Sequence, residues 1–192
     1  MDIGIPLREL GDVDMAELRD VILQQDDSAW HENQYRQQAY DVHNDTQSIV
    51  MIFCDGDWPQ MSISKEAGWD KLAGPALPLM RKIIEEHYPP GGTIIRAMAA
   101  KLVAGGRITP HFDAHQSFRF GHRIHIPITT NAGVRFMIDG RPYQFEIGKG
   151  YEINNQKTHS VMNRGKEDRV TFIFDYVPPK HIDPAKRQAD IV

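Results

Sequence analysis

Residues with metal-binding chemistry occur close together in the second half of this chain. His111 and Asp113 are separated by one residue, and on an extended chain residues i and i+2 point to the same face. Their side chains can therefore reach one metal ion from one side. A His-x-Asp sequence often arises by chance, so this pair alone is a weak indication of a metal site.

A second histidine and an arginine strengthen this indication. His159 lies 46 residues after Asp113, and Arg169 follows His159 by ten positions. We expect residues 159–163 and 170–177 to form a hairpin, which would make His159 and Arg169 neighbours in space. Two histidines and one carboxylate on one face of an octahedral ion leave three positions open, which suits Fe(II) that must bind O2 and a chelating cosubstrate together.

The chemistry of Arg169 indicates which cosubstrate this would be. 2-Oxoglutarate would fill two metal positions with its C1 carboxylate and C2 ketone, and its C5 carboxylate would need a fixed cationic partner. A buried arginine forms a bidentate pair with such a group. Alternation along the strand places Arg169 and Thr171 on a face that we expect to look into a barrel mouth. The other face is apolar and is expected to pack on a second sheet: Val170, Phe172 and Phe174.

The segment 123–129 shows the same alternation. Arg123 and His125 fall on one face, and the isoleucines between and after them fall on the other. A polar pair on an otherwise buried strand is costly unless it has a partner. Two interpretations follow: the pair lies on a solvent-facing sheet surface, or both side chains line the cosubstrate pocket.

Short strands must position these side chains. After Gly92, extended segments recur at a spacing of roughly ten residues with turns between them, and Asp139-Gly140 is a favoured hairpin pair. This pattern predicts an all-β sandwich or barrel. The predicted strands are residues 93–103, 123–129, 134–138, 143–147, 151–154, 159–163 and 170–177.

The part of the chain before this β region shows a mixture of helix and strand signals. Helical apolar spacing covers residues 14–25, with Asp14 as the expected N-cap, and residues 76–87, which end before a Pro-Pro-Gly-Gly stop signal. Residues 48–54 favour a strand, and Asp70 is expected to cap a helix.

The chain length of 192 residues is typical of one domain. Within residues 1–192 we expect a mixed N-terminal part over 1–91 and a β core with the metal site over 92–178. Pro178, Pro179 and Pro184 lead us to expect an extended, peripheral tail over 179–192.

The composition excludes several classes of protein. The single cysteine, Cys54, rules out an internal disulfide, and we expect a buried, inert thiol. Apolar stretches are too short and too charged to cross a membrane and no signal-peptide pattern is present, so we expect a cytoplasmic protein. Residues 101–141 carry six Lys or Arg and four His against two Asp. This excess reflects either chance surface patterning or a site for a small anion, and no Lys/Arg cluster is dense enough to suggest nucleic acid.

Several further segments form an ordered series with the metal motif. The series consists of Pro110-His111-x-Asp113, Arg123-x-His125-Ile126-Pro127, Asn131, Asn154-Asn155 preceding His159, and Asn163-x-Gly165 with Arg169. Together these segments resemble the aspartyl/asparaginyl β-hydroxylase family over residues 92–178. That family belongs to the 2-oxoglutarate/Fe(II) oxygenase superfamily and includes relatives that hydroxylate free proline.

The resemblance implies a mainly β fold with flanking helices: a double-stranded β-helix, or cupin-like jelly roll, with the iron inside one end. His111 and His159 match the two metal histidines of the family, and Arg169 matches the arginine that binds the C5 carboxylate of 2-oxoglutarate. Arg123 and His125 match a pair near the cosubstrate or substrate carboxylate. The best-known animal members have glycine where this chain has Asp113, so the full triad looks like the bacterial small-molecule branch.

These expectations predict a dioxygenase that uses Fe(II), 2-oxoglutarate and O2 to hydroxylate an unactivated C–H bond of a small molecule, such as an amino acid or a derivative. One alternative is the same chemistry on an Asp or Asn side chain of a peptide or protein. Another is a cupin-like protein that binds metal and ligand without oxygen chemistry, although such a protein has no need of Arg169. A catalytically silent module is disfavoured by Asp113. We expect no nucleic-acid or membrane partner, and the oligomeric state is left open.

Overall fold

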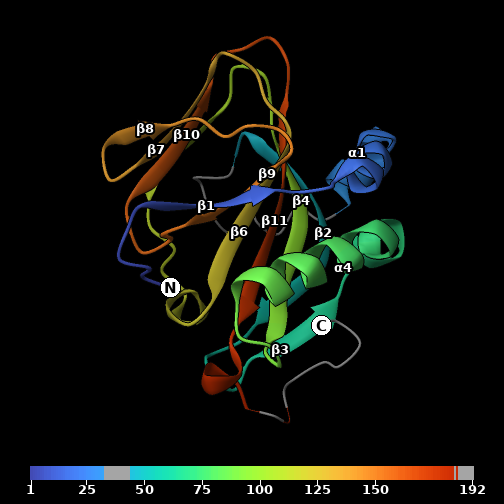
Figure 1. The fold of residues 1–192 in the computed structure, drawn as a ribbon. Helices are drawn as coiled ribbons and strands as arrows, with labels where there is room; N and C mark the ends of the chain where they lie inside the picture. Colours follow the sequence, from blue (N-terminus) through green and yellow to red (C-terminus); the bar gives the residue numbers. More distant parts are fainter. Residues whose placement is uncertain (33–43, 184, 186–192) are drawn as a thin grey trace.

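The computed structural model describes residues 1–32, 44–183 and 185, which form two antiparallel sheets and a helical layer (Figure 1). The larger sheet has the strand order β1-β9-β6-β11-β4-β2-β3, and the smaller has the order β5-β10-β7-β8. This is the mainly β jelly roll expected from the sequence. The strands are β1 (Leu7–Asp12), β2 (Thr46–Asp55), β3 (Ser62–Lys65), β4 (Thr93–Leu102), β5 (Arg107–His111), β6 (His122–Thr129), β7 (Val134–Ile138), β8 (Arg141–Tyr143), β9 (Lys149–Ile153), β10 (His159–Asn163) and β11 (Arg169–Val177).

Helices cover the outer face of the larger sheet. They are α1 (Ala16–Leu23), α2 (Asp27–His31) and α4 (Gly68–His87). In Figure 1 α1 and α4 lie on the side of the larger sheet away from β7, β8 and β10. Apolar side chains of the helices and of β2, β4, β6 and β11 form one core here, including Leu72, Met80, Ile49, Ala99, Ile124 and Phe172. Burial of such side chains is the main source of stability.

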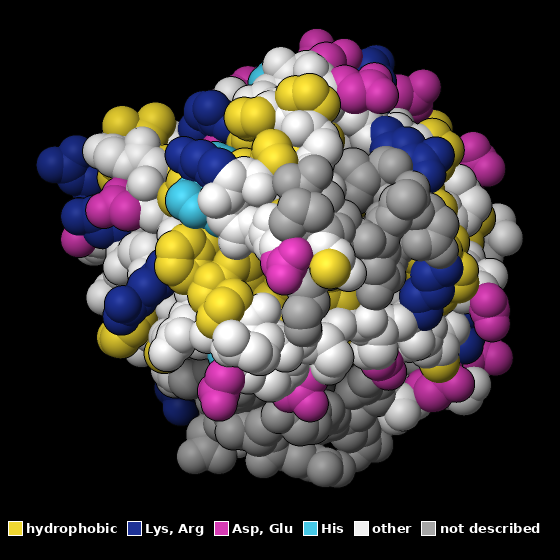
Figure 2. Space-filling model, turned by 90° about the horizontal axis from the view of Figure 1, so that it is seen from below, with side chains coloured by type: hydrophobic (Ala, Val, Ile, Leu, Met, Phe, Trp, Pro, Cys, Tyr) yellow, Lys and Arg dark blue, Asp and Glu magenta, His cyan; other side chains and the backbone are white. Residues whose placement is uncertain are grey.

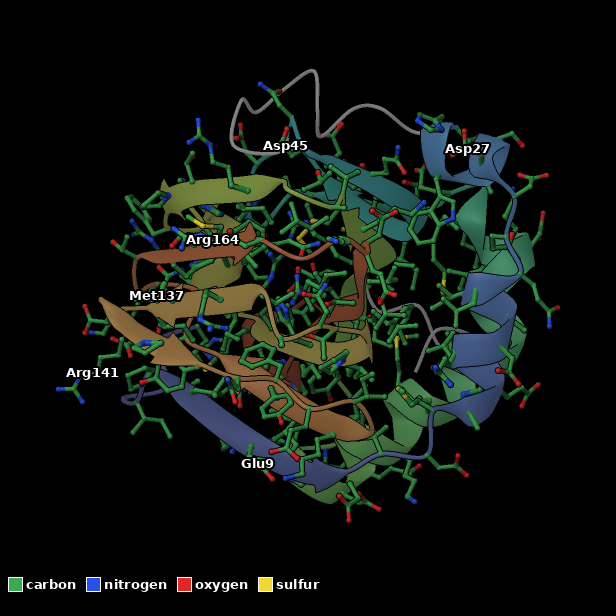
Figure 3. All side chains as sticks on the ribbon, turned by 90° about the horizontal axis from the view of Figure 1, so that it is seen from above. Glu9, Asp27, Asp45, Met137, Arg141 and Arg164 are labelled. Atoms are coloured by element: carbon green, nitrogen blue, oxygen red, sulfur yellow. The ribbon has the colours of Figure 1, made fainter. Side chains whose placement is uncertain are left out.

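The space between the two sheets has a mixed character. Its apolar part contains Leu102, Phe136, Ile138, Phe145, Tyr151, Ile153 and Val161. Because side chains alternate along a strand, the positions between the outward-facing residues of β4, β6 and β11 point into this same space. Many of these inward positions are polar and still buried: Arg96, His125, Arg169, Thr171 and Asp175. Viewed from above, side chains fill the region between the strands (Figure 3).

The surroundings of β11 correct two expectations. The apolar face of the strand, with Phe172 and Phe174, packs against the helical layer and not against a second sheet. β10 and β11 also do not form a hairpin, because β10 pairs with β5 and β7 whereas β11 pairs with β4 and β6. Residues 164–168 therefore cross from one sheet to the other. The alternation was predicted correctly, but alternation alone does not say which layer covers each face.

The helix boundaries differ from those predicted. α4 begins at Gly68 and contains Pro75 and Pro78, with Ala67 as its N-cap. Asp70 therefore lies inside the first turn, and its predicted capping role is wrong. α1 begins at Ala16 after Met15 as N-cap, so the predicted N-cap at Asp14 is also wrong. Packing of the apolar faces outweighs the local signals on which these predictions rested.

The structure confirms one predicted turn and corrects the predictions for the strand after it and for the tail. The Asp139-Gly140 turn is confirmed, with φ of 51° and 74°, but β8 covers Arg141–Tyr143 and not residues 143–147. The tail begins with a short 3-10 helix, Pro179–His181. Ile182 then packs in a small core with Cys54, so this part of the tail is not peripheral. Residues 184 and 186–192 of the predicted tail lie outside the described residues.

The surface carries both signs of charge. On the face seen in Figure 2, hydrophobic side chains gather beside Lys, Arg and His side chains, and acidic side chains lie both among them and around the edge of the same face. Within the described part of the chain, no helix has the length and apolar character needed to cross a membrane. Cys54 is buried, as expected, and burial raises the pKa of its thiol.

Candidate metal centre

The two sequence-predicted histidines and the predicted carboxylate converge at the smaller sheet. His111 ends β5 and His159 begins β10, and the two are direct partners in the antiparallel register. Asp113 follows two positions after the end of β5. One donor atom from each of the three side chains lies within 4.8 Å of the others. The register of two strands thus brings together residues that are far apart in the sequence.

Backbone carbonyls orient both imidazoles. Nδ1 of His111 lies 2.8 Å from the Thr109 carbonyl oxygen, and Nδ1 of His159 lies 3.0 Å from the Lys157 carbonyl oxygen. A carbonyl only accepts, so each Nδ1 carries the proton and each Nε2 presents a lone pair. Burial lowers the pKa of His159, although Asp113 opposes that shift. A neutral imidazole with a free Nε2 is the form that binds metal ions.

The two carboxylate oxygens of Asp113 face different partners. Oδ1 lies 3.9 Å from Nε2 of His111 and 4.0 Å from Nε2 of His159. Oδ2 lies 3.1 Å from Nη1 of Arg123. The backbone N–H of Asp113 donates to the Asn155 carbonyl at 3.1 Å, which ties the loop after β5 to the turn before β10. Oδ1 and the two imidazole Nε2 atoms therefore form a three-donor set.

Arg169 lies in the same cavity as the three donors. That cavity is lined by both histidines, Asp113, Arg123, His125 and Arg169, with apolar residues between them. Arg169 is buried, and no hydrogen bond or ion pair links its guanidinium to any residue that the structure describes. Burial lowers its pKa to about 10. A buried guanidinium without a carboxylate is costly, so this position fits a bound anion.

Two buried hydroxyl groups lie on the inward face of the larger sheet; that of Thr171 was expected there, whereas that of Ser48 was not predicted from the sequence. Ser48 on β2 and Thr171 on β11 both pair with Ala100 on β4, and Ala100 lines the cavity. Both hydroxyls are buried and lack a hydrogen-bond partner among the described residues. Ser48 is a polar residue at an inward position of a strand that was predicted as apolar. Its alternation with Ile49 was the available signal.

Arg123 and His125 both lie inside the molecule, as the cavity-lining interpretation required. Nε and Nη2 of Arg123 each donate to Asp175 at 2.8 Å. Burial opposes the charge of Arg123, but Asp113 and Asp175 outweigh it and raise the pKa above its usual value. His125 contacts the edges of Phe136 and Phe145 at ring-centroid distances of 5.9 and 6.2 Å. The interpretation of a solvent-facing surface is therefore wrong.

The asparagine and glycine motifs organise the crossing between the sheets. The Asn163 side chain donates to the Glu167 carbonyl at 2.8 Å, and its oxygen accepts from Gly165 N–H at 3.1 Å. Asn131 donates to the same Glu167 carbonyl and packs directly on Gly165, where a Cβ would lie 2.2 Å from its Oδ1. These contacts fix residues 164–168. They explain how His159 and Arg169 reach one cavity without a hairpin.

The chain is similar to known proteins in sequence family and in fold. The model of the aspartyl/asparaginyl β-hydroxylase family matches residues 15–179. No curated protein matches the chain. Solved structures of similar fold include an oxidoreductase of the 2OG-Fe(II) oxygenase family from Burkholderia pseudomallei, at 13% identity and TM-score 0.54 over 93% of this chain and 96% of that one.

Two further structures share the fold. The nickel complex of the non-heme monooxygenase ThoJ has 13% identity and TM-score 0.57, over 91% of this chain and 74% of that one. The 2OG complex of a viral collagen prolyl hydroxylase from Paramecium Bursaria Chlorella virus-1 has 9% identity and TM-score 0.52, over 91% and 97%. At these identities the likeness concerns the fold alone.

The donor set and the buried guanidinium suit a ferrous ion with a chelating dicarboxylate, and the family match covers most of the chain. The chain therefore belongs to the aspartyl/asparaginyl β-hydroxylase family of 2-oxoglutarate-dependent oxygenases, enzymes whose cofactors are Fe(II), 2-oxoglutarate and O2.

Proposed function

We propose that this enzyme hydroxylates an unactivated C–H bond of a small molecule, an amino acid or a derivative, and forms succinate and CO2 from 2-oxoglutarate. One observation carries the proposal: three metal donors and a buried guanidinium without a counter-charge line a single cavity. The first group suits Fe(II), and the second suits the distal carboxylate of a dicarboxylic acid.

Each side chain has a defined task in this proposal. His111, Asp113 and His159 hold the metal ion, which with 2-oxoglutarate and O2 supplies the oxidising power for C–H hydroxylation. Arg169 binds the C5 carboxylate, and the hydroxyls of Ser48 and Thr171 lie beside it on the inward face of the sheet. This arrangement fixes the length and direction of the cosubstrate before any substrate enters.

The apolar lining of the cavity has a separate task. Leu102, Phe136, Val161 and Ile173 line it together with the polar side chains. Such a lining excludes water, which strengthens the attraction between Arg169 and a carboxylate and protects the reaction from side products. The protein thus positions the reactants and excludes water from them.

The assignment of a small molecule as substrate rests on Asp113. With Asp113 the chain has the full triad of the bacterial small-molecule branch that it resembles, whereas the best-known animal members have glycine there. The same chemistry on a peptide is the competing assignment, and a solved structure of similar fold is named a collagen prolyl hydroxylase.

A coupled screen tests the proposal. Purified enzyme with Fe(II) and 2-oxoglutarate is offered free amino acids, their derivatives and short Asp-, Asn- or Pro-containing peptides, and succinate is measured together with the mass of each product. We expect substrate-dependent succinate and a gain of one oxygen atom on a free amino acid or derivative. Turnover of peptides alone would contradict the small-molecule assignment. No 2-oxoglutarate consumption with any compound would favour the cupin-like alternative without oxygen chemistry.

A further inference from the structure

Four charged side chains of alternating sign form a row that ends at the cavity, where Arg123 and Asp113 belong to its lining. Arg96 and Asp175 are paired positions on β4 and β11, and Asp175 and Arg123 are paired positions on β11 and β6. Nη1 of Arg96 lies 3.7 Å from Asp175, which binds Arg123 through two hydrogen bonds of 2.8 Å. Arg123 then reaches Asp113 at 3.1 Å. We call Arg96, Asp175, Arg123 and Asp113 the charge ladder.

The charge ladder is held rigidly at its far end. Arg96 donates to the Ser117 hydroxyl at 2.8 Å and to the Cys54 carbonyl at 3.3 Å. The Phe118 ring contacts both arginines, with guanidinium carbons 4.5 Å and 4.4 Å from its centre for Arg96 and Arg123. Planar guanidinium groups stack well on such a ring and lose little freedom when bound. The ladder therefore presents one Nη of Arg123 to Asp113 in a fixed position.

Because of this fixed contact, the two oxygens of the Asp113 carboxylate have different partners. Oδ2 faces Arg123, whereas Oδ1 faces both histidines. If both oxygens bound the metal, the protein would fill four of six octahedral positions. 2-Oxoglutarate would then take the remaining two, and none would remain for O2.

We propose that Arg123 is a positioning residue whose contact with Oδ2 keeps Asp113 monodentate through Oδ1, so that three adjacent metal positions stay open. This inference rests on the proposed function. It gives Arg123 a role different from that implied by the family resemblance, which placed it near a carboxylate of the cosubstrate or substrate. Nε and Nη2 donate hydrogen bonds to Asp175, and Nη1 forms an ion pair with Oδ2 of Asp113, so each of the three nitrogens faces a carboxylate of the protein itself.

The number of water molecules on a bound Mn(II) ion tests this directly. Mn(II) occupies such octahedral sites, and the relaxation rate of water protons rises with the number of exchangeable waters on the ion. The principal variant is Arg123→Met with Asp175→Asn, which removes one charge of each sign and leaves no donor for Oδ2. Circular dichroism and binding stoichiometry establish that the protein is folded and carries one Mn(II).

A second variant keeps the experiment informative if the first does not fold. In Arg123→Lys the ammonium reaches one carboxylate, and Asp175 is the more deeply buried of the two, with 2% of its side chain exposed against 9% for Asp113. Oδ2 of Asp113 again loses its partner. Arg141→Lys on β8 is the matched control, because Arg141 is exposed and points away from the sheets (Figure 3).

The expected result is a fall of about one third in relaxivity per bound Mn(II) in both test variants, because two waters replace three on a six-coordinate ion. The Arg141→Lys control keeps the wild-type value. Relaxivity equal to or above wild type, or loss of Mn(II) binding by a folded variant, overturns the inference. Equal relaxivity with weaker 2-oxoglutarate binding would assign Arg123 to a cosubstrate carboxylate instead.

Mn(II) binding by wild type and by His159→Ala distinguishes a failure of the Arg123 inference from a failure of the proposed function. If wild type binds Mn(II) and His159→Ala does not, the metal assignment stands, and an unchanged relaxivity in the Arg123 variants defeats only the positioning role. If His159→Ala binds Mn(II) as well as wild type does, the proposed function itself fails.

Discussion

Two arginines with little exposure to solvent line the same cavity, and their charges are balanced differently. Arg169 has no ion-pair partner among the described residues, and burial lowers its pKa to about 10. Arg123 exposes only 11% of its side chain, but Asp113 and Asp175 hold its pKa above the usual value. The charge of Arg123 is thus balanced within the protein, whereas the charge of Arg169 is available to a ligand.

The difference shows that one cavity can contain a charge that stabilises the protein and another charge that is kept for a ligand. A desolvated ion that is left unpaired costs several kcal/mol, roughly, even after relaxation. Proteins retain such a group where a ligand completes it. On this account the Arg169 region lowers the stability of the ligand-free enzyme, and the Arg123 region holds the metal carboxylate in place.

The largest expected effect is at the metal donors, which both regions serve. His159→Ala removes one of three donors, so metal binding and succinate formation should fall below about one hundredth of wild type. Metal content by mass spectrometry and succinate release measure this. His87→Ala, at the end of α4 and outside the cavity, is the control. Wild-type-like succinate formation by His159→Ala would refute the ligand assignment.

Stability should respond oppositely at the two arginines. Arg123→Leu removes the main ionic partner of the buried Asp175 and the ion-pair partner of Asp113, and should cost about 3–5 kcal/mol of unfolding free energy. Arg169→Leu replaces an unpaired ion with an apolar group and should leave the stability of the ligand-free protein unchanged or increase it. Urea denaturation of both variants measures this. Equal destabilisation by the two substitutions would remove the contrast between the regions.

The affinity for 2-oxoglutarate should depend specifically on Arg169. Arg169→Leu removes a charge-assisted bidentate contact worth about 1.5–3 kcal/mol, so the 2-oxoglutarate concentration for half-maximal rate should rise roughly 10- to 100-fold. Succinate formation over a range of 2-oxoglutarate concentrations measures this, with Arg141→Lys as the control. An unchanged requirement would remove Arg169 from its role.

The smallest expected effect is on the stability of the protein at low pH. Burial favours the protonated form of Asp175, but Arg123 and Arg96 outweigh it and hold its pKa below the ordinary value of 3.8. Its stabilising contribution is therefore present above this pH and is lost as the pH falls through the lower folded-state pKa. Asp175→Asn should flatten the acid limb of the stability curve, while Asp57→Asn, at an exposed position, should not. Denaturation midpoints measured from about pH 5, above the ordinary carboxyl pKa, down to about pH 2 would show the difference.

Local pattern was sufficient to predict much of this site. Alternation on the strands of Arg123 and Arg169 correctly separated inward polar from outward apolar residues. His-x-Asp and the later histidine do converge. These features depend on short-range geometry, which the sequence states directly.

Long-range pairing was the part that local pattern did not reveal. A tight turn between two strands suggested a hairpin at residues 164–168, whereas the Asn163 network directs the chain into the other sheet. The pairing of Arg96 with Asp175 joins strands 79 positions apart and depends on the sheet order. A charge in an otherwise apolar strand was the available signal that each of these residues has a buried partner.

The central claim is that one cavity binds Fe(II) and 2-oxoglutarate together, and an anaerobic absorption titration tests it most directly. Fe(II) and then 2-oxoglutarate are added to the protein without oxygen. The account predicts a weak visible charge-transfer band that saturates at one equivalent per chain in wild type, requires more 2-oxoglutarate in Arg169→Leu and is absent from His159→Ala. No band in wild type, or an equal band in all three proteins, would contradict it.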